Sequence, residues 1–155
     1  MKLLVVVTLL FASASAYAGA EAKDLVGIWQ DSAMIAAAWS ENYRFFPNGT
    51  VLWGANAMDL DKKLISRRGT WTLRGEDLRL LLTEETVLIG GRFQPEKGGD
   101  GMSSWIGAKA VDRKIPEPII QLTKVGAVTN RNGYPSTILF KQRWWRMRPD
   151  PNNYD

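Results

Sequence analysis

The chain has 155 residues, 45% of them hydrophobic and 23% charged, a balance typical of one globular domain. It contains neither cysteine nor histidine, which excludes disulfides, thiol nucleophiles, His-dependent catalytic triads and Cys- or His-ligated metal sites. Its formal net charge is +4, and its seven Trp residues supply large rigid apolar surfaces for a core or a binding site.

The first residues have the pattern of a secretory signal peptide. Lys2 is a short basic region, residues 3–11 are apolar, and Ala16 and Ala18 are the small residues that define a cleavage site. The apolar run is too short to span a membrane. The pattern predicts a signal peptide over residues 1–18 and one mature domain over 19–155, without a transmembrane segment. Because small eukaryotic secreted domains usually carry disulfides, an exported chain without cysteine favours the bacterial periplasm.

Short runs of alternating apolar and polar residues, separated by turn residues, predict an antiparallel β-protein of eight or nine strands. The expected strands are 25–30, 43–46, 50–53, 65–73, 77–83, 86–93, 105–111, 119–125 and 136–147. The predicted turns are at Asn48-Gly49, Arg74-Gly75-Glu76, Pro116-Glu117-Pro118 and Arg131-Asn132-Gly133. Strands of this number close into an up-and-down barrel or split into a sandwich, and we expect the barrel because it leaves no exposed edge.

Two segments add detail to this barrel. Residues 31–39 begin with a capping-type residue followed by strong helix formers, and predict a short helical flap after the first strand. In residues 77–83 and the strand before them, one face carries the core: Trp71, Leu73, Leu78, Leu80 and Leu82. In the last strand the alternation assigns Ile138, Phe140, Gln142, Trp144 and Arg146 inward, and places Trp145 outward.

Four short motifs resemble those of the small lipocalin-like, calycin-type domains of exported bacterial proteins. They are LVGIW at residues 25–29, FPNGTV at 46–51, GTWTL at 69–73 and GEDL at 75–78. The resemblance covers about residues 25–83 and implies an up-and-down barrel, with the segment after the first strand near the open mouth. Barrels of this size hold one small ligand or are filled by side chains.

The favoured function is non-enzymatic binding of a small apolar or anionic amphipathic molecule in the barrel. Met34, Ile35 and Trp39 would line the mouth, with Tyr43 and Trp53 deeper inside. The alternative is that these side chains plug the barrel and form its core.

The second hypothesis is a protein-binding module of the inhibitor or immunity type. Residues 109–148 carry nine basic and two acidic residues, whereas residues 19–108 carry ten basic and twelve acidic. This asymmetry indicates an acidic partner or, alternatively, solvated strand faces. Lys141, Arg143 and Trp145 would form the contact surface, unless Arg143 only packs on Trp145.

Other chemistries have little support in the sequence. The acidic pairs Asp59/Asp61 and Glu84/Glu85 are read as solvated loop charges rather than catalytic carboxylates or calcium ligands. Export argues against nucleic-acid binding. We therefore expect no catalytic residues, no metal and no cofactor.

Overall fold

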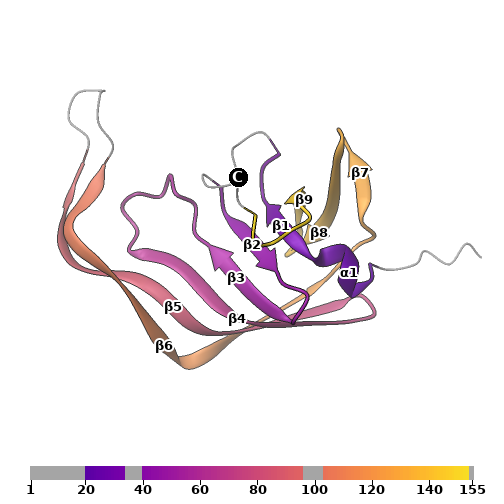
Figure 1. Cartoon of the computed structure of the whole chain (residues 1–155), viewed down its shortest axis with the longest axis horizontal. Helices are drawn as coiled ribbons and strands as arrows, with labels where there is room; N and C mark the ends of the chain where they lie inside the picture. Colours follow the sequence, from indigo (N-terminus) through magenta and orange to yellow (C-terminus); the bar gives the residue numbers. More distant parts are fainter. Residues whose placement is uncertain (1–19, 34–39, 96–102, 154–155) are drawn as a thin grey trace, which may run out of the picture.

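The structure is a computed structural model that describes residues 20–33, 40–95 and 103–153. In these residues one short helix and nine strands are present (Figure 1). They are α1 (Ala22–Leu25), β1 (Gly27–Gln30), β2 (Asn42–Phe45), β3 (Thr50–Gly54), β4 (Leu64–Arg74), β5 (Asp77–Gln94), β6 (Ser104–Lys124), β7 (Thr129–Arg131), β8 (Tyr134–Leu139) and β9 (Gln142–Arg148). The predicted signal peptide and residues 34–39 of the predicted helical flap lie outside the described residues, and residues 31–33 are not helical.

The described strands form one antiparallel sheet in the order β6-β5-β4-β3-β2-β1-β9-β8-β7. The antiparallel all-β prediction is therefore confirmed, but the sheet is not closed. Each edge strand, β6 and β7, pairs with one neighbour in the described residues. Instead of a ladder between the edge strands, single contacts join the end of β6 to the β8–β9 hairpin: Phe140 N donates to Thr123 Oγ1 at 2.9 Å, and Thr137 Oγ1 donates to Gly126 O at 2.8 Å.

The predicted tight turns between neighbouring strands are present at three positions. Gly49 has φ +81° between β2 and β3, and Gly75 has φ +58° between β4 and β5, values that glycine adopts without the strain of a Cβ atom. Asn132-Gly133 joins β7 to β8. These turns set the register in which the alternating core residues meet.

The predicted turn at Pro116-Glu117-Pro118 is wrong. Those residues lie within β6, a single strand of 21 residues, and the predicted strands 77–83 and 86–93 are likewise one strand, β5. The β5–β6 register shifts between Leu82, which pairs with Ile119, and Glu84, which pairs with Lys114. The prolines therefore sit in a bulge on an edge strand, where their missing N–H costs no ladder hydrogen bond.

The predicted strand 136–147 is also wrong, because it is a hairpin. β8 and β9 are joined by Phe140 and Lys141, both with left-handed φ of 51° and 65°. The reversal breaks the alternation assumed from the sequence. Leu139 is fully buried and Ile138 is 38% exposed, the opposite of the prediction, whereas Trp144 is buried as predicted.

The core lies on one side of the sheet, here called the inner face. The predicted core residues of β4 and β5 are confirmed there, with Trp71, Leu78, Leu80 and Leu82 buried and Leu73 packed against them. The sheet curls around this face and brings distant strands together. Tyr43 OH of β2 donates to Gln121 Oε1 of β6 at 3.1 Å, although three strands lie between β2 and β6 in the sheet. The opposite side is called the outer face.

Candidate functional site

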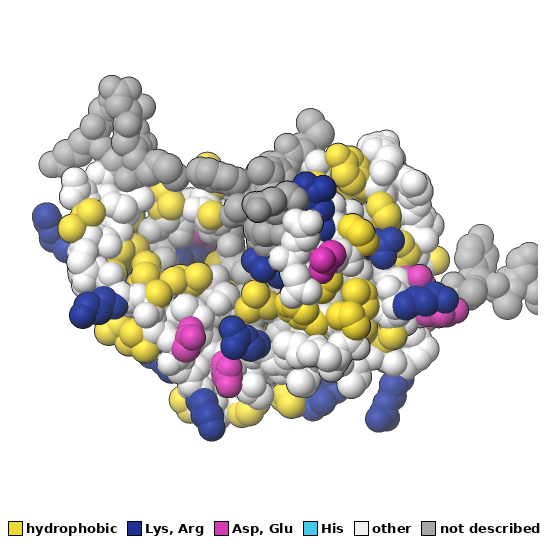
Figure 2. Space-filling view, viewed as in Figure 1, with side chains coloured by type: hydrophobic (Ala, Val, Ile, Leu, Met, Phe, Trp, Pro, Cys, Tyr) yellow, Lys and Arg dark blue, Asp and Glu magenta, His cyan; other side chains and the backbone are white. Residues whose placement is uncertain are grey.

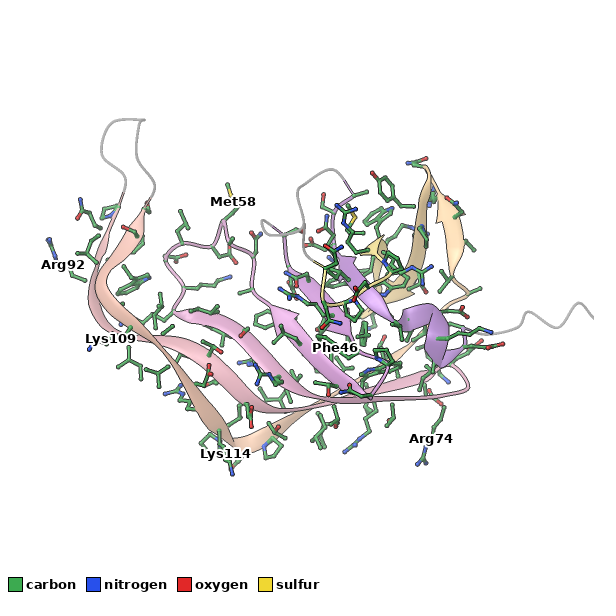
Figure 3. All side chains as sticks on the ribbon, viewed as in Figure 1. Phe46, Met58, Arg74, Arg92, Lys109 and Lys114 are labelled. Carbon is green, nitrogen blue, oxygen red and sulfur yellow. The ribbon has the colours of Figure 1, made fainter. Side chains whose placement is uncertain are left out.

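A groove of about 560 Å³ lies on the outer face of β2, β3 and β4. Its walls are the loop 55–63, which joins β3 to β4, and the arm, defined as residues 84–94 of β5 together with 104–114 of β6. Figure 3 labels Met58 on the loop and Arg92 and Lys109 on the arm. A volume of this size is within the range of small-molecule sites, about 300–1,000 Å³.

The register of three strands builds the floor of the groove. Asn42 pairs with Gly54, and Gly54 pairs with Ser66, so the three residues form a row across the outer face. A Cβ atom on Gly54 would lie 2.8 Å from Asn42 Nδ2. The glycine therefore leaves the space in which the Asn42 amide lies.

Two residues that line the groove, Asn42 and Trp105, each have a buried polar side-chain atom without a hydrogen-bond partner in the described part of the chain. Asn42 is 3% exposed, and its Nδ2 donates to Ser40 O at 3.1 Å while its Oδ1 accepts no hydrogen bond from a described residue. Trp105 Nε1 is likewise buried and donates to none of the described residues. Leaving such a group unsatisfied costs about 1–3 kcal/mol, so native proteins keep few of them.

The arm is tied to the loop beside Trp105. Lys63 Nζ lies 4.2 Å from the centroid of the Trp105 ring and donates to Gly90 O at 3.1 Å. Leu88 N donates to Lys63 O at 2.8 Å. These contacts join elements that are distant in sequence and hold the indole at the groove.

The remaining lining of the groove combines aliphatic side chains with serine, asparagine and charged side chains, and its balance of charge is positive. Its aliphatic side chains are those of Leu52, Leu60, Leu64, Ile65 and Leu88. Asp59 accepts a hydrogen bond from Lys62, which raises the pKa of that lysine and keeps it protonated. Arg44 adds a further positive charge to the lining.

Tyr43 and Trp53, predicted to bind the ligand, are register partners on the inner face rather than in this groove. Tyr43 is 3% exposed and is bonded to Gln121, and Trp53 Nε1 donates to Glu41 Oε1 at 2.7 Å. The inner face around Tyr43 is filled by aromatic rings, with Trp144 at a centroid distance of 5.0 Å. Met34, Ile35 and Trp39 lie outside the described residues.

A charged cluster links the arm to β4 on the same inner face. Arg113 donates to Glu85 Oε1 from Nε at 3.0 Å and from Nη2 at 2.8 Å, and Arg67 Nε lies 3.6 Å from Glu85 Oε2. The Arg67 guanidinium lies 5.7 Å from the centroid of the Trp53 ring. Glu85, one of the predicted acidic pair Glu84/Glu85, therefore forms ion pairs with two arginines at the base of the arm and is not a solvated loop charge.

The three residues of the second predicted surface lie on two neighbouring elements. Lys141 is in the β8–β9 turn, whereas Arg143 and Trp145 lie on the outer face of β9. Arg143 Nη1 donates to Ser136 Oγ at 3.1 Å, and Trp145 pairs in register with both Gln30 and Ser136. Trp145 is half-buried, so its outward prediction holds only in part.

Comparisons with protein-family models, with curated proteins and with solved structures found no match for this chain. Within the described residues, no group of three or more potential ligands is placed to hold a metal ion. No helix there is long and apolar enough to cross a membrane.

Sequence reasoning missed Asn42, Arg44, Leu88 and Trp105 as groove residues. One signal was available, because an asparagine at the start of a strand otherwise made of aromatic and basic residues is unusual. The wall formed by the arm had no sequence signal, since it depends on how a long hairpin bends over strands far away in the chain.

Proposed function

We propose that this protein is a non-enzymatic binding protein that holds a small amphipathic molecule in the outer-face groove. The observation that carries the proposal is that two residues lining the groove, Asn42 and Trp105, each keep a buried polar atom (Asn42 Oδ1 and Trp105 Nε1) without a hydrogen-bond partner in the described residues. A ligand that satisfies both would remove a cost that the free protein bears. The resemblance to lipocalin-like domains supports a binding role, and the pattern over residues 1–18 supports export to the periplasm.

The lining suggests the chemistry of the ligand. Trp105 Nε1 can only donate and Asn42 Oδ1 can only accept, so an anionic head would accept a hydrogen bond from Trp105 Nε1 and would reach Asn42 Oδ1 through a bridging water. The charges of Arg44 and Lys62 against Asp59 favour an anionic head. The aliphatic side chains would bury the tail at roughly 25 cal/mol per Å².

Isothermal titration with three matched probes tests this function: decanoate, decanol and decyltrimethylammonium. We expect decanoate to bind with the highest affinity and the cation with the lowest. Trp105→Phe keeps the aromatic packing but removes the N–H, and Arg44→Gln removes the charge. Each variant should weaken decanoate binding about tenfold, the effect of one lost hydrogen bond or charge.

The matched control is Arg92→Gln, which removes an exposed charge from the arm outside the groove lining and should leave the affinity unchanged. The proposal fails if decanoate gives no saturable binding at millimolar concentration. It also fails if Trp105→Phe and Arg44→Gln bind decanoate as the unchanged protein does.

A further inference from the structure

A second cavity, of about 750 Å³, lies at the edge of the sheet where β6 diverges from the β8–β9 hairpin. Its lining includes residues from both faces of the sheet, since Leu122 and Thr123 are neighbours on β6 and point to opposite sides. The cavity is therefore at the edge of β6 rather than on one of its faces. We call it the edge cleft.

The edge cleft borders backbone that has no partner strand. In the described residues β6 pairs with β5 only, so the outer edge of residues 119–122 is free, and the cleft begins at Leu122, the last residue of this stretch. On the other side, residues 137–139 of β8 extend beyond β7, whose pairing ends at Ser136. The hydrogen bond from Phe140 N to Thr123 Oγ1 marks where the β8–β9 turn meets β6.

The side chains around the cleft are apolar and unusually exposed. Leu122 and Ile138 line the cleft and are 71% and 38% exposed, the first being the highest value among the large hydrophobic side chains described. Ile120, two residues before Leu122 on the same face of β6, lies outside the lining and is 54% exposed. Phe140 and Leu78 complete the apolar lining. Figure 2 shows exposed hydrophobic side chains among Lys and Arg side chains along the lower rim of the molecule, on the side where β5 and β6 run in Figure 1.

The charge around the cleft is positive. Asp77 is its acidic residue, and it is paired with Lys124, whose Nζ lies 2.8 Å from Asp77 Oδ1. Arg79 and Lys141 also line the cleft, and neither forms an ion pair with a described residue. Two positive charges therefore remain to attract a negatively charged partner.

From this arrangement we infer that the edge cleft binds an extended acidic segment of a partner protein, which adds as a strand to residues 119–122 of β6. The free edge supplies backbone hydrogen bonds to any extended chain, and alternate side chains of that segment would contact Leu122 and Ile120. Arg79 and Lys141 select acidic residues among the other side chains. This site is separate from the groove and does not depend on the function proposed for it.

The test uses the full mature chain labelled with ¹⁵N and a short capped peptide in which valine and glutamate alternate. We expect saturable chemical-shift changes at residues 119–124 and 138–141. Lys141→Glu should weaken binding about tenfold by placing like charges together. Lys109→Glu makes the same charge change on the arm of the same strand, away from the cleft, and should have no effect.

Three results would overturn the inference. The first is an absence of saturable shifts with the acidic peptide. The second is equal binding of the same peptide with lysine in place of glutamate, or with a central proline that cannot pair as a strand. The third is binding to anionic phosphatidylglycerol vesicles without binding to the peptide, which would assign the cleft to a membrane surface.

Discussion

Tyr43 is the residue that ties the centre of the sheet to its edge. Its ring contacts Phe45, Phe140 and Trp144 at centroid distances of 5.8, 5.5 and 5.0 Å, and its hydroxyl reaches Gln121. Burial, helped by the negative charge of Glu41, raises the pKa of Tyr43 above its ordinary value. The phenol therefore stays neutral in the folded protein at pH values where an exposed tyrosine ionises.

This shift predicts a loss of stability in alkaline solution. Below the unfolded-state pKa of about 10, both states hold the phenol proton and the shift contributes nothing to pH dependence. As pH rises above that value the unfolded chain releases the proton and the folded chain keeps it, so the free energy of unfolding falls by up to about 1.4 kcal/mol per pH unit. Urea unfolding between neutral pH and pH 11 measures the fall.

The matched variant is Tyr43→Phe, which retains the ring packing and removes the ionisable group. It should be less stable at neutral pH by about 1 kcal/mol, because the Gln121 hydrogen bond is lost, yet less sensitive to pH. Some lysines have a pKa raised by a neighbouring carboxylate, such as Lys124 beside Asp77. They are present in both proteins, so their contribution to the pH dependence of stability cancels in the comparison. Parallel pH profiles for the two proteins would contradict the assignment, and Tyr134→Phe, at an exposed site, is the control.

Among the strands, β4 depends on a close backbone approach at Gly69. The β4–β5 register shifts between Arg68 and Gly69, and a Cβ atom on Gly69 would lie 1.8 Å from Leu81 O and 2.7 Å from Leu82 Cα. Both obstacles are backbone atoms, so a side-chain rotation cannot relieve the clash. The glycine is required by space at this bulge.

We therefore expect Gly69→Ala to lower the free energy of unfolding by about 3 kcal/mol, since the strands must separate to admit one methyl group. Thr70→Ala, at the neighbouring exposed position of β4, should change it by less than about 1 kcal/mol. Chemical denaturation of the two variants beside the unchanged protein measures both effects. A Gly69→Ala protein as stable as the Thr70→Ala protein would show that the two strands can separate at little cost.

The elements were predictable where local chemistry decides the chain path and not where distant contacts do. Asn48-Gly49 and Gly75 form the turns that their residue types predict, and the alternation of Leu78, Leu80 and Leu82 identifies the core face. Phe140 and Lys141 turn the chain without glycine, asparagine or proline, so no turn was expected there. The residues between Ile115 and Ile119 contain two prolines and were predicted to turn, yet the pairing of long strands on either side holds them in a bulge.

The candidate site was harder to predict than the fold. The sequence identifies Tyr43 and Trp53 as aromatic residues on one face of neighbouring strands, and they do lie together. Their face, however, is filled by rings from β9 and the β8–β9 turn, which reach it only because the sheet curls. The groove needs Trp105 beside Asn42, a proximity that strand alternation does not encode.

The molecule as a whole consists of a packed body and an arm that extends from it (Figure 1). Leu78, Leu80 and Leu82 of β5 are at most 1% exposed, whereas Val87 is the last buried residue of β5, and Ile89 and Ile106 on the arm are 49% and 54% exposed. Local opening requires little energy where few apolar side chains are buried. The free energy of local opening should therefore be lower for the arm than for the body.

Amide hydrogen exchange should resolve these two regions. We expect amides of residues 78–82 to exchange only through global unfolding, and those of the arm beyond Val87 to exchange faster by local opening. Trp105→Ala removes the ring that Lys63 and Phe93 hold against the loop, so it should accelerate exchange in the arm and leave residues 78–82 unchanged. Ile106→Ala, at the next position and 54% exposed, should alter neither rate. If Trp105→Ala accelerated exchange equally throughout the sheet, the arm and the body would be one cooperative unit, and the groove between them would be a rigid part of the core.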